Sequence, residues 1–259
     1  RHPKVIKTLR GLPKTFRSFT NPNAFKNRNK LKVMKTVPLE YGKYYHIYNR
    51  GINGCNLFYD DENYEHFLHL YDKYISPVAD TFAWVLMKNH FHLLVRLKGF
   101  EEIPYMVQTP EGQRDASGSA KNLSASLRPE SVSFTQKKYK PSNQFSHLFN
   151  AYTKAINKRY HRTGSLFEHP FRRIPVITND QLKYLIYYIH HNPIHHGFCE
   201  HFLEYPWSSY LTVLSPKQTR LNRNEVLEWF GNKAYFKEYH SKEQIEKYKK
   251  MEIDYSDDC

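Results

Sequence analysis

Two apolar segments joined by two polar residues constrain the fold of this chain most strongly. Thr81–Met87 (TFAWVLM) and His90–Leu97 (HFHLLVRL) are rich in β-branched and aromatic residues, and Lys88-Asn89 can form a turn between them. The pattern predicts a β-hairpin.

The segments around this hairpin alternate between strand and helix patterns. The sequence predicts further strands at Tyr44–Asn49 and Phe171–Ile177, and helices at Asp60–Tyr74, Gln144–Tyr160 and from an Asn179 N-cap to about Asn192. Pro193 is expected to end the last of these helices, and short helical pieces are expected within residues 207–250. The predicted fold is α+β, an antiparallel sheet with helices mainly on one face and a helical C-terminal extension.

Charge and composition divide the chain into three parts. Residues 1–33 contain ten Lys and Arg and no Asp or Glu, and removing these ten charges from the net +14 leaves +4. Since Met34 directly precedes the first strand pattern, we expect residues 1–33 to be a leader, a mis-set reading frame or a disordered arm. We expect a folded domain at 34–215, with a long mobile insertion at 101–143 that is rich in Ser, Gly, Pro, Lys and Gln, and a helical extension at 216–259.

Several protein classes are excluded by the same composition. No apolar run approaches the roughly 20 residues of a membrane span, and no secretory signal pattern opens the chain. The three cysteines, Cys55, Cys199 and Cys259, are far apart and form neither a disulfide framework nor a CxxC zinc motif. We therefore expect a cytoplasmic protein without a membrane partner, and the sequence indicates no protein partner.

His90 and His92 are the first candidates for a functional site. Alternate residues of a strand share a face, so the two imidazoles project together, and Phe91, Leu93 and Val95 project to the opposite, core face. Two neutral imidazoles on one face are a start for a divalent metal site, which we expect on the exposed face of the sheet. The motif alone is weak, because 15 histidines produce about one His-x-His pair by chance.

Tyr188 and Asn192 are the second candidates. In the predicted helix they are i,i+4 neighbours on the flank of the apolar stripe, where they can reach past the sheet edge and meet solvent, and Tyr187 faces away from them. Tyr188 could equally be one of many packing tyrosines, and Asn192 could simply be a residue at the end of the helix. The stripe is formed by Leu182, Leu185, Ile186 and Ile189.

A basic and aromatic segment is the third candidate. Interleaved cations and aromatic rings suit single-stranded nucleic acid, although a solvated helix end gives a similar pattern. The candidate contacts are Arg50, Lys158, Arg159, Arg162, Arg172 and Arg173, with His161, Phe167 and Phe171 among them. The segment His190–His196 (HHNPIHH) looks like a metal-binding motif, but Pro193 interrupts it. We do not expect a separate metal site there.

Five sequence blocks in this order resemble the REP-associated tyrosine transposases, relatives of the single-tyrosine transposases in the HUH endonuclease superfamily. The blocks are YYHIYNRG, VLMKNHFHLLVRL, RTGSLFEHPFRRIPV, LIYYIHHNPIHHGF and YPWSSY, and the likeness covers roughly residues 40–214. The resemblance implies a ferredoxin-like (RRM-like) sheet, a divalent metal (Mg²⁺ or Mn²⁺), and a tyrosine nucleophile acting on single-stranded DNA next to a hairpin.

The resemblance also implies roles for individual residues. His90 and His92 match the metal-binding HUH motif, Tyr188 matches the nucleophile, and Asn192 matches a polar residue that completes the metal site, where the insertion-sequence relatives usually have Gln. The implied activity is that of a DNA nickase and strand transferase with a 5′-phosphotyrosine intermediate. The insertion at 101–143 and residues 1–33 depart from the family pattern.

Two other functions stay open from the sequence. The first is a domesticated protein of the same fold that binds structured nucleic acid without cutting it. The second is an unrelated metallohydrolase, which would need an acidic third ligand near His90 and His92 that the sequence does not supply. His46, on the first predicted strand, could approach the same site, but the sequence assigns it no role.

Overall fold

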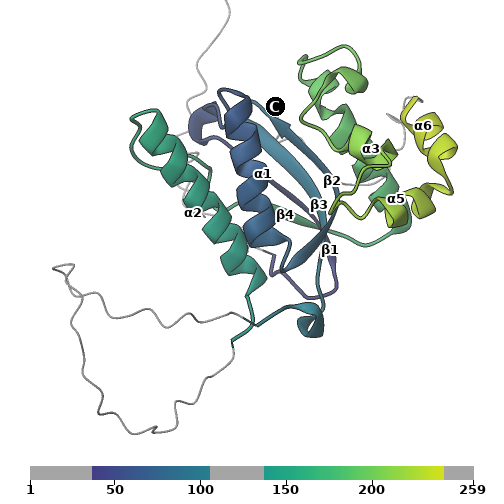
Figure 1. Ribbon diagram of the computed structural model, residues 1–259, viewed down its shortest axis with the longest axis horizontal. Helices are drawn as coiled ribbons and strands as arrows, with labels where there is room; N and C mark the ends of the chain where they lie inside the picture. The colour runs from purple at the N-terminus through teal and green to yellow at the C-terminus, as the bar shows by residue number, and fades with distance from the viewer. Residues whose placement is uncertain (1–36, 106–136, 242–259) are drawn as a thin grey trace, which may run out of the picture. The chain divides into compact units, whose positions relative to one another are not determined.

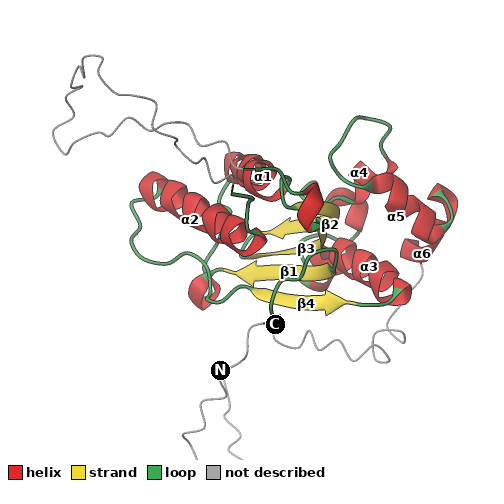
Figure 2. Ribbon diagram, turned by 90° about the horizontal axis from the view of Figure 1, so that it is seen from below, coloured by secondary structure: helices red, strands yellow, loops and turns green. Residues whose placement is uncertain are grey.

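A four-stranded antiparallel sheet is the framework of the protein in the computed structural model, which describes residues 37–105 and 137–241. The strands are β1 (Tyr44–Arg50), β2 (Ala79–Met87), β3 (His90–Leu97) and β4 (Arg172–Val176). Their order across the sheet is β2-β3-β1-β4, with all neighbours antiparallel (Figure 2). All four predicted strands are confirmed, with the hairpin turn at Lys88-Asn89.

The helices complete a ferredoxin-like βαββαβ arrangement. Helix α1 (Asp61–Ile75) lies between β1 and β2 in the chain, and α2 (Pro141–Arg159) lies between β3 and β4. Figure 1 shows α1 and α2 side by side against the sheet. The predicted α+β fold with an antiparallel sheet is thereby confirmed, and both helices of the ferredoxin-like unit lie on one face.

The C-terminal helices pack on the other face of the sheet. They are α3 (Asn179–His195), α4 (Tyr210–Leu214), α5 (Arg223–Phe230) and α6 (Lys233–Ser241). Short 3₁₀ turns lie at Ile52–Gly54, Phe100–Glu102 and Phe202–Glu204. In the described ranges, no helix combines the length and the apolar character that crossing a membrane requires. The predicted leader at 1–33, most of the predicted insertion and the end of the extension lie outside the described residues.

Helix α3 differs from its prediction at both ends. Its N-cap is Thr178 and not Asn179: the Thr178 hydroxyl accepts the N–H of Gln181, and the Gln181 side chain accepts the N–H of Thr178. This reciprocal capping box satisfies two backbone donors, whereas an Asn179 cap would satisfy one.

Pro193 does not end α3, which continues to His195. Proline removes one backbone donor from the last turn, but the N–H of His196 still bonds to the Asn192 carbonyl at 3.1 Å. The turn that carries Asn192 therefore stays helical, and Asn192 keeps its place one turn after Tyr188.

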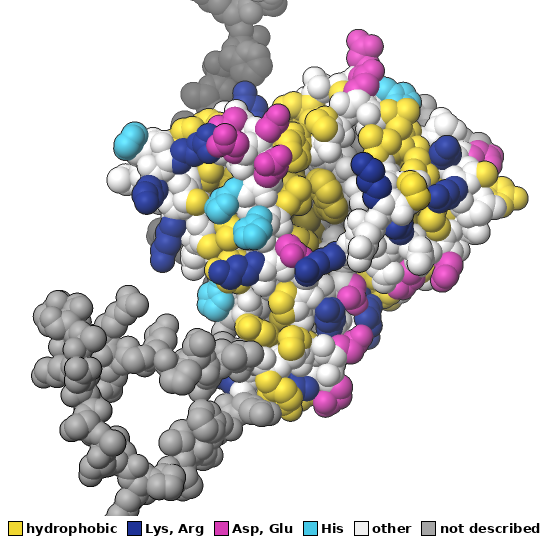
Figure 3. Space-filling view, viewed as in Figure 1, with side chains coloured by type: hydrophobic (Ala, Val, Ile, Leu, Met, Phe, Trp, Pro, Cys, Tyr) yellow, Lys and Arg dark blue, Asp and Glu magenta, His cyan; other side chains and the backbone are white. Residues whose placement is uncertain are grey.

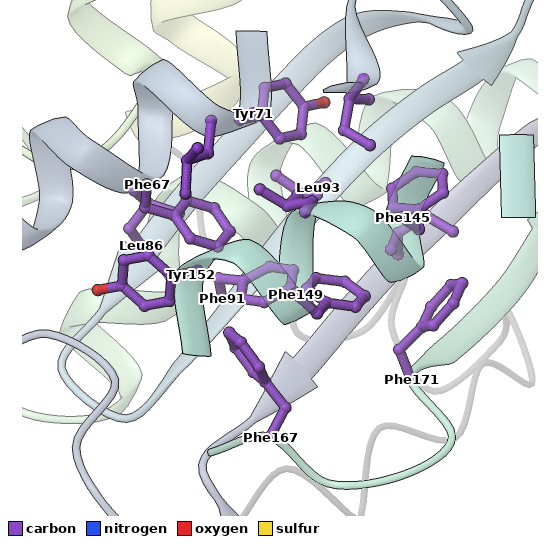
Figure 4. Packing of buried hydrophobic residues seen from close by; sticks show 14 of the residues in the cluster. Phe67, Tyr71, Leu86, Phe91, Leu93, Phe145, Phe149, Tyr152, Phe167 and Phe171 are labelled. Carbon is purple, nitrogen blue, oxygen red and sulfur yellow. The ribbon is translucent and has the colours of Figure 1, made fainter. Parts of the chain in front are cut away.

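A large aromatic cluster joins α1 and α2 to the sheet (Figure 4). Phe91 from β3 lies at its centre, with ring centroids 5.3 Å from Phe67 of α1 and 5.9 Å from Phe149 of α2. The side chains of Phe67 and Phe91 have no exposed surface. The face of β3 opposite to His90 and His92 therefore packs the core, as the alternation of the strand predicts.

Truncation of Phe91 to alanine is expected to lower the free energy of unfolding by about 3–5 kcal/mol, because it removes a buried ring and leaves a cavity. Urea unfolding measures this value. Phe198→Ala is the matched control, since that ring is 42% exposed, and its cost should be much smaller. Equal losses in the two variants would contradict the central position of Phe91.

A chain of buried hydrogen bonds joins α6 to α3. The Phe236 carbonyl lies 2.8 Å from Nδ1 of His240, so this nitrogen carries the proton, and Nε2 of His240 lies 2.9 Å from Nδ1 of His190. Nε2 of His190 lies 2.9 Å from the Ser209 hydroxyl. Burial lowers the pKa of His240 to about 3 and holds that of His190 well below its usual value.

Stability is expected to fall as the pH drops from about 6.5 towards 3. Unfolded His240 takes up a proton at its ordinary pKa near 6.5, and the folded protein resists this until about pH 3. Between pH 7 and pH 5 this one group should remove about 2 kcal/mol of unfolding free energy. His240→Phe should show a correspondingly smaller change in urea unfolding over the same range, and an unchanged pH dependence would refute the assignment.

Candidate functional site

His90 and His92 lie on the same face of β3, as predicted. In the register between β1 and β3, Arg50 is opposite His90, Tyr48 is opposite His92, and His46 is opposite Leu94. Directly opposite residues of an antiparallel pair share a face. Strand β1 therefore contributes His46, Tyr48 and Arg50 to the face of the sheet that bears His90 and His92, which we call the histidine face.

This face is covered, which corrects the expectation of an exposed metal site. His92 has no exposed surface and His90 is 7% exposed, because α3 packs across this side of the sheet. Tyr188 is 8% exposed and Asn192 is 1% exposed, so neither side chain meets solvent in the way that the helical wheel predicts. The wheel gives the direction of these side chains but does not include the element against which they pack.

Helix α3 brings Tyr188 and Asn192 to the two imidazoles. The Tyr188 ring meets His92 edge to face, with centroids 5.5 Å apart, and meets His46 at 6.1 Å. Oδ1 of Asn192 lies 3.4 Å from Nε2 of His90. The four residues that the sequence selects from two distant segments are thus neighbours in space.

Tyr187 lies in a different environment from Tyr188. Its ring stacks on His191 with centroids 3.9 Å apart and contacts Tyr239 and His240 of α6. The predicted divergence of the two adjacent tyrosines is confirmed: Tyr188 faces the histidines of the sheet, and Tyr187 faces α6.

The ring of His90 is oriented by two asparagines. Oδ1 of Asn89 lies 2.7 Å from Nδ1 of His90, so Nδ1 carries the ring proton and Nε2 carries the lone pair. Burial, with the neighbouring His196 as a second cause, lowers the pKa of His90 to about 4, so the ring is neutral at pH 7. Nε2 of His90 then faces the Asn192 amide, which can present Nδ2 as a hydrogen-bond donor or Oδ1 as a metal ligand.

The ring of His92 contacts a third histidine. Nδ1 of His92 lies 2.9 Å from Nε2 of His46. Burial lowers the pKa of His46 to about 3, and burial together with the nearby histidines holds the pKa of His92 well below its usual value. Nε2 of His92 is buried and has no hydrogen-bond partner among the described residues, and the same holds for Nδ2 of Asn192.

These groups are of the type that binds a divalent cation: two neutral imidazoles and an amide. Nε2 of His92 in particular is buried without a hydrogen-bond partner among the described residues, which is costly unless another group occupies it. In the described part of the chain, no three His, Cys, Asp or Glu side chains are grouped so that they could bind one metal ion. The candidate ligand set is therefore His90, His92 and the amide of Asn192.

The sequence missed the contributions of Asn89 and His196 to this site, and it indicated that His46 could approach without assigning it a role. Asn89 lies in the hairpin turn and contacts His90, and the His196 ring meets His90 edge to face at 4.6 Å. Alternation along β1 places His46 on the histidine face, but only the order of the strands makes β1 the neighbour of β3. Nothing in the local sequence marks Asn89 or His196 as partners of His90.

The predicted nucleic-acid contacts do not form one cluster. Arg50 and Arg172 share the histidine face, because both lie in register with its residues. Arg173 projects to the other face, where its guanidinium lies 4.3 Å from the Phe171 ring.

The remaining cations lie at the C-terminal end of α2. Arg159 forms ion pairs with Asp60 and Glu62 of the α1 N-terminus. Nη2 of Arg162 lies 3.8 Å from Sγ of Cys55, and Lys158 is exposed. On the histidine face, by contrast, Arg50 of β1 forms an ion pair with Glu168 at 3.1 Å. The roles of all six cations in nucleic-acid binding stay predictions.

The histidine-rich segment 190–196 does not form a site of its own among the described residues. His190 bonds to α6 and Ser209, His191 stacks on Tyr187, and His196 contacts His90. His190 and His191 both contact His240 of α6, whereas His196 points to the sheet and contacts His90.

A separate cavity lies away from the histidines, between α1, β2 and the segment before α5. It has a volume of about 510 Å³, an apolar floor that includes Phe67, Tyr71 and Trp84, and charged groups that include Asp72 and Arg220 at its rim. Figure 3 shows a hollow with an apolar floor on this face. None of the predicted site residues lines this cavity.

Comparison with known proteins gives a likeness to a solved structure. No protein-family model matches the chain, and no curated protein matches it. A solved structure described as "Structure of the REP associates tyrosine transposase bound to a REP hairpin" is similar, with a TM-score of 0.45 and 14% sequence identity. The match covers 71% of this chain and 87% of that chain. The protein in that structure is from the family that the sequence motifs resemble.

Proposed function

We propose that this protein is a metal-dependent single-stranded DNA endonuclease and strand transferase that cuts near hairpins through a 5′-phosphotyrosine intermediate. The observation that carries the proposal is that one turn of α3, from Tyr188 to Asn192, lies against the two histidines of β3. Tyr188 lies against His92, and Asn192, one turn later, lies against His90. A nucleophile beside a cluster of inward-facing donors is the arrangement that phosphoryl transfer requires.

His90, His92 and Asn192 would hold the divalent cation. When bound, such a cation supplies Lewis-acid polarisation of a phosphoryl oxygen. Two nitrogen donors suit Mn²⁺ better than Mg²⁺, because Mg²⁺ strongly prefers an all-oxygen shell. Mn²⁺ is therefore the cation for the first assays, with Mg²⁺ as the comparison.

Tyr188 is the proposed nucleophile. Its phenol oxygen attacks the phosphorus and loses its proton, and the bond from phosphorus to the 3′ oxygen breaks. The upstream strand leaves as a 3′-hydroxyl after proton uptake, and the downstream strand stays attached to Tyr188 through its 5′-phosphate. The new phosphodiester keeps the energy of the old one, so another 3′-hydroxyl can reverse the step without ATP.

DNA access to this site requires movement. Because Tyr188, His90 and His92 are buried, a phosphodiester reaches them only after α3 or the Tyr188 side chain shifts away from the sheet. Arg50 and Arg172 are the proposed phosphate contacts nearest in the sheet, since both lie on the histidine face. The other four predicted cations would contact DNA at a distance from the chemistry.

The test is covalent capture on hairpin-bearing single-stranded DNA with Mn²⁺. A denaturing gel should show label from 3′-end-labelled DNA attached to the protein, whereas 5′-end-labelled DNA should give a free, shortened product. Omission of metal and a scrambled strand without the hairpin are the controls. Binding without any adduct would favour the domesticated, non-catalytic protein, and absence of both binding and cleavage would reject the proposal.

A further inference from the structure

The hydrogen bond between His46 and His92 joins two side chains that have no exposed surface. It links Nε2 of His46 on β1 with Nδ1 of His92 on β3, 2.9 Å apart. The ring planes lie within 20° of each other, and the nitrogens are much closer than the centroids at 5.1 Å. The rings therefore meet edge to edge, with the hydrogen bond close to a shared plane.

Tyr48 holds this pair of rings in place. It stacks on His46 at 4.7 Å and 25°, and on His92 at 5.5 Å and 22°. Tyr188 meets both imidazoles edge to face. Since rings contact the pair from two directions, His92 has little freedom to rotate away from His46.

A single proton occupies the hydrogen bond between two neutral imidazoles. If His92 donates from Nδ1, its Nε2 carries the lone pair that a metal ligand needs. If His46 donates from Nε2, then Nε2 of His92 carries a hydrogen. Only the first arrangement lets Nε2 of His92 act as a metal ligand, because in the second a hydrogen occupies that nitrogen.

His90 shows the same pattern through a different residue. Its Nδ1 faces an acceptor oxygen, Oδ1 of Asn89, at 2.7 Å, which leaves Nε2 as the nitrogen with the lone pair. If Nδ1 of His90 and Nδ1 of His92 each face an acceptor, these two rings have the same tautomer, and Nε2 is available for a metal in both.

We propose that His46 is a positioning residue that accepts the Nδ1 proton of His92 and thereby holds Nε2 of His92 in its metal-binding form. This inference rests on the proposed function for its metal, but it makes a separate statement about the proton on His92. A hydrogen bond at the second ring nitrogen of a metal-binding histidine fixes its tautomer and raises its affinity for the metal.

The tautomer is tested first, in the metal-free full-length protein. Ring ¹⁵N chemical shifts of histidine-labelled protein, assigned with His92→Gln, should show His92 protonated at Nδ1 and unprotonated at Nε2. A proton on Nε2 of His92 would overturn the proposal. This measurement does not depend on any bound metal or on activity.

Mn²⁺ affinity is tested next, by titration calorimetry on full-length variants. His46→Phe keeps a ring but offers no acceptor, and it should weaken Mn²⁺ binding by about 10–100-fold. His46→Gln, whose amide oxygen can take the place of Nε2, should restore part of this loss. His240→Phe removes another buried, hydrogen-bonded histidine and is the control for general destabilisation, so its Mn²⁺ affinity should match the wild type.

The outcomes separate the two proposals. Wild-type protein that binds no Mn²⁺ overturns the metal-dependent function, and the ¹⁵N shifts then decide the role of His46 alone. Wild-type affinity that persists in His46→Phe overturns the role of His46 and leaves the proposed function standing. Equal losses in His46→Phe and His240→Phe would mean that His46 acts only through stability, which also overturns it.

Discussion

Replacing Tyr188 with phenylalanine should eliminate the covalent protein–DNA adduct while leaving hairpin binding and folding close to wild type. The substitution removes one hydroxyl and keeps the ring that packs edge to face on His46 and His92. The expected result on a denaturing gel is no protein-linked label from 3′-end-labelled DNA, even after long incubation with Mn²⁺.

Tyr187→Phe is the matched control for this experiment. It removes the same hydroxyl from the neighbouring residue of the same helix, where the ring stacks on His191 and contacts α6. Its adduct should form at a rate close to the wild-type rate. Peptide mapping that finds DNA on any other tyrosine, or an adduct that persists in Tyr188→Phe, would refute the assigned nucleophile.

Removal of both His90 and His92 should have an equally large effect on cleavage. The double alanine variant loses two of the three proposed donors, so Mn²⁺-dependent cleavage should fall by more than about 1,000-fold. Calorimetry should find that the Mn²⁺ site is lost, while hairpin binding, which uses phosphate contacts elsewhere, should be largely retained.

His66→Ala with His69→Ala is the control pair for the double variant. Both residues are exposed on α1, on the other side of the sheet from His90 and His92. This pair should cleave as the wild type does. Undiminished metal-dependent cleavage after loss of His90 and His92 would rule out the proposed ligand set, and circular dichroism would check that each variant is folded.

The strands and the ferredoxin-like unit could be predicted from the sequence because their patterns are local. The β3 segment alternates between His90, His92 and the core residues Phe91 and Leu93, and its boundaries agree with those of the structure. Helix α1 begins after Asp60, whose carboxylate accepts the N–H of Asn63. The alternation of side chains along a strand and the cap of a helix are properties of a few consecutive residues. They can therefore be recognised without knowledge of tertiary contacts.

The burial of the site could not be predicted in the same way. The helical wheel places Tyr188 and Asn192 on the flank of α3, but only the docking of α3 on β2 and β3 turns that flank into an interior surface. The partners of His90 and His92 are also non-local: His46 comes from another strand, and Asn192 lies 102 residues after His90. Such contacts depend on strand order and helix packing, which the local sequence does not encode.

The sheet separates two hydrophobic cores, and this has a consequence for how related chains can diverge. Residues of β1 and β3 pack one set of side chains towards α1 and α2, and the clusters on the two faces share no fully buried residue in the described chain. Substitutions in distant clusters without shared partners have additive effects on stability. Mutations on the α1–α2 side can therefore accumulate while the side that bears His90, His92 and Tyr188 stays under independent selection. Trp84, which packs against both clusters, is the residue at which this independence should break down.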